Sequence, residues 1–496
     1  MSGQPGPRTP PAASAAVGLL EVMDVLAPLA GRFVAAGHEV SLVGGPVRDL
    51  MRGQGPARDL DLTTSARPEV VVALLEGWAD AVWDVGMRFG TVGARKGDHR
   101  LEITTYRTEA YDDSSRKPEV AFGDSLAGDL VRRDFTINAM AVRLPTLEFV
   151  DLHGGMDDLR EGLLRTPGTP EDSFGDDPLR MMRAARFVSQ LGFDVDPDAL
   201  DAMRRMASRI DIVSAERVRD ELVKLLLGDH PRRGLEILVE TGLAERVLPE
   251  LPALQLEVDE HHRHKDVYQH SLTVMDQAID LETAHEPTMP PDLVLRLSAL
   301  LHDIGKPRTR RFDDAGGVSF HHHEVVGARM VRKRLTALRF PQDVVDDVSR
   351  LTELHLRFHG YGTGEWADSA VRRYVRDAGD LLPRLHKLTR ADCTTRNRRR
   401  ALALQEAYDG LEGRIAELSE QEELASIRPD LDGHEIMEVL GIPAGPQVGQ
   451  AYRYLLEVRL DRGPLGREAA EGLLRSWWEG KGHATRDPQE GGSVPD

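Results

Sequence analysis

The sequence predicts an α+β N-terminal region, a mixed β-sheet with helices, followed by domains that are helical throughout. Short β-like runs alternate with helical patterns up to about residue 165, and helical periodicity dominates from there on. The length of 496 residues exceeds that of a single domain, so we expect a multidomain protein. The expected segments are a disordered tail (1–17), the α+β region (18–165), a helical neck (166–260), a second helical domain (261–400), a C-terminal helical tail (401–479) and a disordered end (480–496).

The elements follow from local patterns. The β-like runs of the first region are HEVSLVGG, RDLDLTT, TVGARK, LEITTYR and LEFVDL. The clearest helix is DPLRMMRAARFVSQLGF, which begins with Asp177 and Pro178 and ends near Gly192; these residue types are typical helix start and stop signals. A later helical run is QEAYDGLEGRIAELSEQEEL. Residues 1–17 are rich in Pro, Gly and Ala, a composition that predicts disorder.

The composition disfavours a membrane protein and a disulfide framework. No apolar run approaches the roughly 18 residues that a membrane span needs, and the N-terminus lacks the features of a signal peptide. Cys393 is the single cysteine, so we expect a reducing, cytoplasmic compartment. The net charge of −19 argues mildly against a nucleic-acid partner, but residues 366–400 carry ten Lys/Arg against four Asp/Glu. Such a local surface is enough to bind a phosphate backbone.

The most informative segment is LVGGPVRDLMRGQGPARDLDLTT. A strand runs into Gly44 and Gly45, and glycines at this place let the backbone approach a ligand closely. The N–H groups of the following helical turn, together with Arg48, offer a phosphate site. An ordinary strand-to-helix turn is the alternative.

A pair of carboxylates follows in the same segment. Asp59 and Asp61 lie at i and i+2 of a strand, so both side chains share one face. Two adjacent carboxylates repel one another unless a cation lies between them, and Mg²⁺ prefers carboxylate and phosphate oxygens. Glu102, in LEITTYR, becomes a third member if a neighbouring strand brings it against the pair. A solvated strand face is the alternative for all three residues.

These motifs resemble those of the polymerase-β-type nucleotidyltransferases, in the branch that comprises class II CCA-adding tRNA nucleotidyltransferases and bacterial poly(A) polymerases. The resemblance extends to RRDFTINAMA (Arg132–Ala141) and DDPLRMMRAARF (Asp176–Phe187), although the family usually has Glu at position 176. It implies a nucleotidyltransferase head that binds Mg²⁺ through Asp59 and Asp61. It also implies phosphate and ribose contacts from Arg133 and Asp134, a supporting role for Asn138, and a flexible loop in the segment 107–118.

The motif DDPLRMMRAARF, which lies in the expected helical neck, is suited to recognising a nucleotide base without a nucleic-acid template. Cytosine and adenine share an exocyclic amine beside an unprotonated ring nitrogen, whereas uracil and guanine present a carbonyl beside an N–H. The carboxylate of Asp177 can accept from the amine and Arg180 can donate to the ring nitrogen. Arg183 and Arg186 continue the same helix face and could hold the triphosphate or order the pair of Asp177 and Arg180. The alternative is that Asp177 is an N-cap and the arginines form a solvated stripe.

A second constellation lies in the helical half. His270, the adjacent pair His302 and Asp303, and Asp392 resemble the ligands of the HD metal-dependent phosphohydrolase superfamily. Imidazole and carboxylate together bind divalent transition metals, which activate water for attack on phosphorus. His323, in HHHEVVGA, resembles a further element of that motif, in a register that three consecutive histidines leave open. The alternative is a helical scaffold that retains ligands without activity.

The sequence thus predicts an enzyme that adds CCA to tRNA 3′ ends from CTP and ATP by two-metal nucleotidyl transfer, with possible additional phosphohydrolase activity. Its expected partners are the tRNA 3′ end, CTP and ATP, with no membrane. A bacterial poly(A) polymerase is the alternative within the same chemistry. An HD-domain phosphohydrolase with a degenerate head is the alternative from another class, and the intact pair of Asp59 and Asp61 argues against it.

Overall fold

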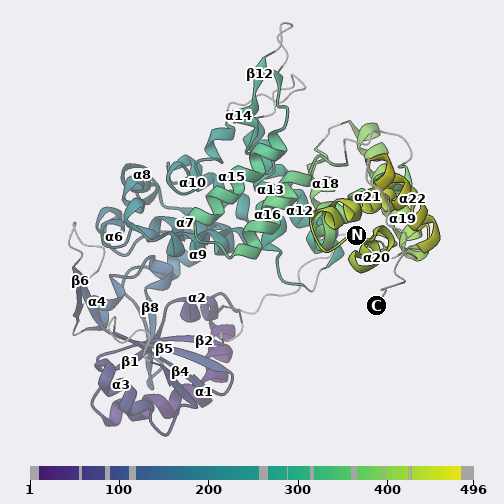
Figure 1. Ribbon diagram of the computed structural model, residues 1–496. Helices are drawn as coiled ribbons and strands as arrows, with labels where there is room; N and C mark the ends of the chain where they lie inside the picture. The colour runs from purple at the N-terminus through teal and green to yellow at the C-terminus, as the bar shows by residue number, and fades with distance from the viewer. Residues whose placement is uncertain are drawn as a thin grey trace, which may run out of the picture. The chain divides into compact units, whose positions relative to one another are not determined.

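The structure is a computed structural model, and its contacts divide the chain into two compact units (Figure 1). The first unit comprises Met1–Pro252 with Ala337–Phe340, and the second comprises Ala253–Thr336 with Pro341–Asp496. The described residues are 11–54, 58–83, 90–110, 119–123, 125–255, 266–286, 289–312, 318–358, 366–394, 397–422, 424 and 427–481.

A seven-stranded mixed sheet forms the N-terminal part of the first unit (Figure 1). Its strands are β1 (Val40–Val43), β2 (Asp59–Thr64), β3 (Ala81–Trp83), β4 (Thr91–Lys96), β5 (His99–Thr105), β8 (Met140–Leu144) and β9 (Phe149–Asp151). Their spatial order is β3-β4-β5-β2-β1-β8-β9. Strands β2 and β5 are parallel, and the remaining neighbours in this sheet are antiparallel. The sheet confirms the expected α+β class.

One face of this sheet is a hydrophobic core. Leu60 and Leu62 of β2 are fully buried, and the helices α1 (Pro11–Ala35) and α3 (Pro68–Leu75) contact strands of the sheet. Because side chains alternate along a strand, the carboxylates of β2 lie on the opposite face. Helix α1 begins earlier than the composition led us to expect, since alanines, which favour helix, are frequent in residues 11–17.

The remaining elements of the head are a pair of short strands and several short helices. Strands β6 (Arg107–Ala110) and β7 (Glu119–Phe122) form an antiparallel pair. The intervening residues 111–118 of the expected flexible loop lie outside the described part of the chain. The head helices are α2 (Gly45–Met51), α4 (Leu126–Leu130), the 3₁₀ turn η2 (Thr136–Asn138) and α5 (Gly155–Glu161).

The neck is helical, as predicted. Its helices are α6 (Pro170–Asp176), α7 (Leu179–Leu191), α8 (Pro197–Met206), η3 (Ala207–Ile212), α9 (Ala215–Leu226), α10 (Pro231–Glu240), α11 (Ala244–Val247) and η4 (Pro252–Leu254). Two short strands, β10 (Leu163–Leu164) and β11 (Asp194–Val195), pair in parallel. Strand β10 precedes α6 in the chain, and β11 lies between α7 and α8. Helix α7 packs against α9 and α10. It ends at Gly192, whose φ of 71° is left-handed, as the sequence predicted.

The second unit is also almost entirely helical. Its elements are α12 (Val267–His285), α13 (Leu293–Leu301), α14 (Lys306–Thr309), β12 (Arg311–Phe312), β13 (Val318–Ser319), α15 (His323–Ala337), α16 (Gln342–Leu354), α17 (Asp368–Ala378), η6 (Gly379–Leu381), α18 (Leu382–Asp392), α19 (Arg398–Gln421), α20 (Gly433–Leu440), α21 (Pro446–Arg462) and α22 (Arg467–Gly480). None of the described helices of the chain combines the length and the apolar composition that a bilayer crossing needs.

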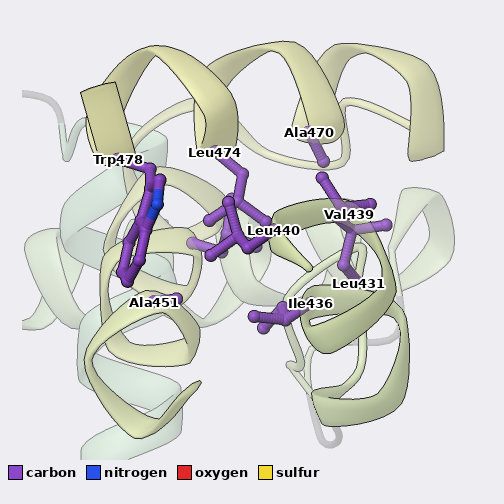
Figure 2. Packing of buried hydrophobic residues seen from close by; sticks show 9 residues of the cluster. Leu431, Ile436, Val439, Leu440, Ala451, Ala470, Leu474 and Trp478 are labelled. Atoms are coloured by element: carbon purple, nitrogen blue, oxygen red, sulfur yellow. The ribbon is translucent and has the colours of Figure 1, made fainter. Parts of the chain in front are cut away.

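The last three helices share a small core of their own. Figure 2 shows Leu440, Leu474 and Trp478 meeting between α20, α21 and α22. Helix α20 begins with a capping box, in which Asp432 and Glu435 satisfy each other's backbone N–H groups. This core makes the end of the described chain a folded part of the second unit.

Candidate functional site

The predicted carboxylates meet on one face of the head sheet. Asp61 of β2 is the register partner of Glu102 on the parallel strand β5, and Asp59 precedes Asp61 by two residues. The three side chains therefore leave the sheet on the same side. Asp61 is partly buried, whereas Asp59 and Glu102 are exposed. The neighbouring strand thus supplies the third carboxylate that the sequence predicted.

This arrangement disfavours negative charge on Asp61. Burial raises the pKa of Asp61 to about 6; nearby Arg133 opposes that rise, and Glu102 and Asp59 add to it. A bound cation removes the repulsion among the carboxylates, and their oxygen atoms are the ligands that Mg²⁺ prefers. The residues therefore fit the predicted magnesium site.

Arg133 is fixed beside these carboxylates by a residue that the sequence did not single out. Asp129 is buried, and its Oδ2 accepts hydrogen bonds from Arg133 Nη2 at 3.1 Å and from Thr63 Oγ1 at 3.1 Å. Thr63 lies on β2, two residues after Asp61. Asp129 thus connects the guanidinium to the strand that carries Asp59 and Asp61.

The Gly44–Gly45 turn lies directly over this site. Gly44 has a φ of 74°, which favours glycine, and a Cβ there would lie 3.2 Å from Arg133 Nη1 and 3.4 Å from Asp61 Oδ2. A Cβ on Gly45 would lie 3.6 Å from Arg48 Nη2. The close approach that the two glycines predicted is therefore present at Gly44.

The other predicted head residues form a chain of side-chain hydrogen bonds. Arg48 donates to both carboxylate oxygens of Asp49 and, through Nη1, to Asn138 Oδ1 at 2.9 Å. Asn138 Nδ2 donates in turn to Asp134 Oδ1 at 2.9 Å. Burial raises the pKa of Asp134, but Arg183 and Asn138 outweigh it, so the pKa lies below its usual value. Asp134 is therefore a buried anion held by its neighbours.

The proposed base-reading pair occupies the start of α7. Asp177 Oδ1 accepts from the backbone N–H of Leu179 at 3.1 Å, as a capping residue does, and Oδ2 accepts from Arg217 at 2.9 Å. Arg180 is buried and donates to the carbonyl and hydroxyl oxygens of Ser173 and to the carbonyl of Arg132. Asp177 thus has the geometry of the alternative N-cap, and Arg180 is not part of a solvated stripe.

The other two arginines of this helix, Arg183 and Arg186, form ion pairs with a residue that the sequence did not single out. Glu221 of α9 is buried, and it lies 3.5 Å from Arg183 Nε and 3.2 Å from Arg186 Nε. Arg183 also lies 3.4 Å from Asp134 Oδ2. In sequence, Glu221 looks like one charge of an ordinary amphipathic helix, so no local signal marks it. The arginines connect the neck helices to the head motif instead of forming a solvated stripe.

The HD residues converge from three helices of the second unit. His270 of α12 lies with Nε2 2.9 Å from Asp392 Oδ1 at the end of α18, and 3.3 Å from His302 Nε2 after α13. Together His270, His302 and Asp392 form a compact group with metal-ligand atoms facing one another. Burial lowers the pKa of His302, but Asp303 and Asp392 outweigh it and raise the pKa to about 10. The carboxylates thus favour positive charge at this point.

A second group adjoins the first through Asp303. Its Oδ1 lies 3.2 Å from His323 Nε2 and 3.9 Å from His355 Nε2, and its Oδ2 lies 3.2 Å from His302 Nε2. The structure therefore selects His323 from the run of three histidines. His355, in TELHLRF, was missed because its distant place in the sequence carries no spacing signal.

The histidines are oriented for a metal. His302, His323 and His355 each point Nδ1 at the carbonyl three residues earlier, at 2.7–2.8 Å. This contact directs Nε2 toward Asp303, as is common for metal-binding histidines. Within the described residues, the buried Nε2 atoms of His323 and His355 make no hydrogen bond. The donor set therefore fits one or two divalent cations.

Within the basic stretch of residues 366–400, most basic side chains of α17 and α18 are matched by acids. The pairs join these residues to acids in or at the ends of other helices, namely Arg372 with Glu422, Arg373 with Glu457 and Asp461, Arg384 with Asp292, Lys387 with Glu286, and Arg390 with Asp409 and Glu412. Counting charges along the sequence missed these partners, because several of them lie about 50 to 100 residues away.

Three stretches of the chain match known families. Residues 40–165 match the poly A polymerase head domain, residues 192–254 the probable RNA and SrmB-binding site of polymerase A, and residues 267–397 the HD domain. A head with three carboxylates together with an HD centre defines a nucleotidyltransferase of the poly(A) polymerase type.

Similar proteins narrow this class. The chain is 35% identical over 456 residues to the A-adding tRNA nucleotidyltransferase of Deinococcus radiodurans, covering 88% of this chain and 95% of that protein. It is 44% identical over 213 residues to the CCA-adding enzyme of Lactobacillus helveticus, 43% of this chain and 52% of that enzyme. The crystal structure of Bacillus stearothermophilus CCA-adding enzyme in complex with CTP matches with a TM-score of 0.63 and 25% identity, over 96% of this chain and 99% of that one. The chain belongs to the family of tRNA nucleotidyltransferases and bacterial poly(A) polymerases with an HD domain.

Proposed function

We propose that this nucleotidyltransferase adds CCA to the 3′ end of tRNA from CTP and ATP, without a template and by a two-metal mechanism. The observation that carries the proposal is the cluster of Asp59, Asp61 and Glu102 beneath the Gly44 turn. Mg²⁺ ions bound there would activate the attacking 3′ hydroxyl and stabilise the departing pyrophosphate. Asp59 and Asp61 are the proposed magnesium ligands, and Glu102 completes the carboxylate face.

The surrounding residues position the nucleotide. Arg133, beside Asp61, offers a guanidinium to the triphosphate. Asp177 and Arg180 read the base: an acceptor and a donor at the start of one helix match the amine and ring nitrogen that cytosine and adenine share. Both side chains already have protein partners. Base reading therefore requires that each exchanges a partner for the base or shares a donor or acceptor with it.

A second candidate is addition of the terminal adenosine alone. The similarity to the Deinococcus radiodurans A-adding enzyme spans almost the whole chain, whereas the similarity to the Lactobacillus helveticus CCA-adding enzyme spans less than half of it. Three tRNA substrates separate the two candidates: one that lacks all of CCA, one that ends in the first C and one that ends in CC, each with CTP, ATP or both.

Incorporation of C into the first two substrates supports CCA addition. Addition of A only to the tRNA that ends in CC supports the A-adding alternative. Long adenosine tracts on any substrate support a poly(A) polymerase.

The HD centre supports a second activity, metal-dependent hydrolysis of a phosphoester. The two groups that share Asp303 carry the proposal. His270, His302, Asp303 and Asp392 would hold the cation, and His323 and His355 would extend the site. A bound divalent transition metal would supply an activated water. A 2′,3′-cyclic phosphate is a suitable substrate, because its removal frees the 3′ hydroxyl that nucleotide addition needs. Release of phosphate or opening of the cyclic ester by the Ni²⁺- or Mn²⁺-loaded protein tests the activity.

A further inference from the structure

A row of register partners crosses the head sheet from β3 to β2. Trp83 of β3 pairs with Gly93 of β4, Gly93 with Glu102 of β5, and Glu102 with Asp61 of β2. Register partners on neighbouring strands project to the same face of a sheet. Trp83 therefore shares the face of the carboxylates, three strand spacings or about 14 Å from Asp61.

Gly93 gives the indole of Trp83 its place on this face. A Cβ at position 93 would lie 1.9 Å from Trp83 Nε1 and 2.2 Å from Trp83 Cε2, so the ring occupies the space directly above the glycine. Any larger residue at this position would push the indole away from the strand. Trp83 is only partly buried. The sheet therefore holds the ring in place while part of its surface stays accessible.

Positive charge lies against this ring. Arg100 Cζ is 5.4 Å from the centroid of the Trp83 ring, and the side chain of Arg100 is 58% exposed. Arg100 Nη2 also lies 3.5 Å from Glu102 Oε1, in an ion pair that is weak because both partners are exposed. Arg95, the register partner of Arg100 on β4, is exposed and projects to the same face. We call Trp83, Arg95 and Arg100 the β3–β5 platform.

The composition of the β3–β5 platform suits a single-stranded nucleic acid. Bases stack on an aromatic ring or on the plane of a guanidinium, and arginines also bind the phosphates that link the bases. Stacking of this kind tolerates any base. It therefore suits an RNA end whose terminal base changes with every nucleotide that is added.

The direction of attack assigns this platform to the RNA and not to the incoming nucleotide. Arg133, the proposed triphosphate contact, lies beside Gly44 at the end of β1, and β1 and β5 flank β2 on opposite sides. The platform lies on the β5 side. In phosphoryl transfer the attacking and leaving oxygens are roughly in line, on opposite sides of the phosphorus. If pyrophosphate leaves on the β1 side, the attacking 3′ hydroxyl arrives from the side of the platform.

We propose that the β3–β5 platform binds the last nucleotides of the RNA strand that accepts the new nucleotide, with a base on Trp83 and a phosphate on Arg100. This inference rests on the proposed nucleotidyl transfer and adds to it the residues that hold the acceptor strand. Trp83 and Arg100 position the 3′ hydroxyl for attack and exchange no proton with it. The separation of about 14 Å from Asp61 places the contact within the last few nucleotides.

Trp83→Ala in the full-length protein tests the stacking contact. We expect kcat/KM for the tRNA to fall about tenfold, as the loss of a base–aromatic contact does, while KM for the nucleotide at saturating tRNA stays unchanged. Trp83→Phe keeps a ring and should retain most of the wild-type value. The matched control is Val82→Ala. Val82 is 40% exposed on the same strand and projects to the opposite face, so this variant should behave like the wild type.

The salt dependence of RNA binding tests the phosphate contact. The probe is an RNA hairpin with a single-stranded 3′ end, and Arg100→Gln should reduce the slope of log affinity against log salt concentration by about 0.7. Hairpins with one abasic nucleotide near the 3′ end then locate the stacked base. At one abasic position the wild type and Trp83→Ala should bind equally well, because the base that Trp83 contacts is already missing.

The outcomes separate the platform from the proposed function. If the wild type extends no tRNA end, nucleotidyl transfer fails as a function, and hairpin affinity decides on the platform: Trp83→Ala should weaken it and Val82→Ala should not. Trp83→Leu, which keeps an apolar group over Gly93 without a ring, takes the place of Trp83→Ala if the latter has a lowered Tm. The platform is refuted if these variants bind and react like Val82→Ala, if KM for the nucleotide rises as much as KM for the tRNA, or if Arg100→Gln keeps the wild-type salt slope.

Discussion

Asp61 on β2 and Glu102 on β5 are register partners on adjacent parallel strands, so two carboxylates from segments 41 residues apart face the same side of the head sheet. Asp59 adds a third from the same strand. The effect of this crowding is visible on Asp61, where burial raises the pKa to about 6 and Glu102 and Asp59 contribute to the rise. The site therefore favours either a proton or a metal ion at this position.

Replacing either aspartate should abolish nucleotide incorporation. We expect Asp61→Ala and Asp59→Ala to reduce the rate of single-nucleotide addition by at least about 10³-fold, as loss of a metal anchor does. Binding of tRNA, measured by filter retention, should stay close to that of the wild type. Asp61→Asn is the control for folding: it removes a destabilising charge, so its Tm in EDTA should equal or exceed that of the wild type. Near-normal incorporation by any of these variants contradicts the magnesium assignment.

The raised pKa of Asp61 predicts a pH-dependent requirement for magnesium. Because the folded pKa is about 6, above the usual 3.8, Asp61 is protonated in the metal-free protein below about pH 6. Mg²⁺ must displace this proton, so its half-saturating concentration should rise about tenfold for each pH unit below 6 and change little above 7. Magnesium titrations of single-nucleotide addition between pH 5 and 8 measure it. Equal half-saturation at pH 5 and pH 7 would disprove the link.

The same pKa has a consequence for stability. A carboxyl group with a raised folded pKa stabilises the fold below the unfolded value of about 3.8 and loses that contribution as the pH rises through about 6. In EDTA, Asp61→Asn should therefore gain stability over the wild type at pH 7 and not at pH 4, apart from contributions common to both proteins. Chemical denaturation at the two pH values tests this sign.

Asp177→Asn separates capping from base selection. Asparagine still accepts the backbone N–H of Leu179, and the lost pair with half-exposed Arg217 contributes about 0–1 kcal/mol, so the free energy of unfolding should change by less than about 1 kcal/mol. The amide also offers a donor where the carboxylate offers only acceptors, so the preference for CTP and ATP over UTP and GTP should fall about tenfold or more. Competition between labelled nucleotides in a single-addition assay gives the ratio. Unchanged selectivity in a folded variant would assign Asp177 to capping alone.

Glu221 should matter for stability and for the arrangement of the neck. Glu221→Gln keeps the shape but leaves Arg183 and Arg186 without their shared anion, and breaking a buried ion pair costs about 3–5 kcal/mol. Glu216→Gln, an exposed change on the same helix, should cost less than about 0.5 kcal/mol. Urea denaturation of both variants measures the difference, and similar values would show that Glu221 has no special role.

The fold class could be predicted because it depends on local patterns. The runs HEVSLVGG, RDLDLTT, TVGARK and LEITTYR all contain observed strands, and Gly192 ends the predicted helix. The start of α1 was missed because composition averages over alanines that favour helix. The net charge of residues 366–400 did not reveal that Arg372 and Arg384 pair with acids that are distant in sequence.

The candidate site could be predicted where several of its residues lie in one sequence motif. Asp59 and Asp61 share a strand, and period-two geometry places them together. Glu102 needed a strand pairing that the sequence only suggested. Glu221 and His355 could not be found, because each reaches its partners through helix packing and stands alone in its own segment. The proposed roles of the nucleotide-binding residues remain predictions.

The head site and the HD centre should be chemically independent. His302→Ala or Asp303→Ala should leave nucleotide addition to tRNA mostly unaffected, because the head site offers only carboxylate oxygens whereas the HD centre offers mixed nitrogen and oxygen ligands. The same changes should lower bound Ni, Mn, Zn or Fe in elemental analysis and abolish any hydrolysis of 2′,3′-cyclic phosphate.

Two neighbouring histidines provide a matched pair for this test. His323 is buried against Asp303, whereas His321 is exposed two residues earlier. His323→Ala should lower the metal content and His321→Ala should not, although both remove one imidazole from the same run. Equal metal content in the two variants would exclude His323 as a ligand. Loss of nucleotide addition in a folded His302→Ala protein would show that the centres are coupled, and a wild type without stoichiometric metal beyond Mg²⁺ and without phosphoesterase activity would make the HD centre structural.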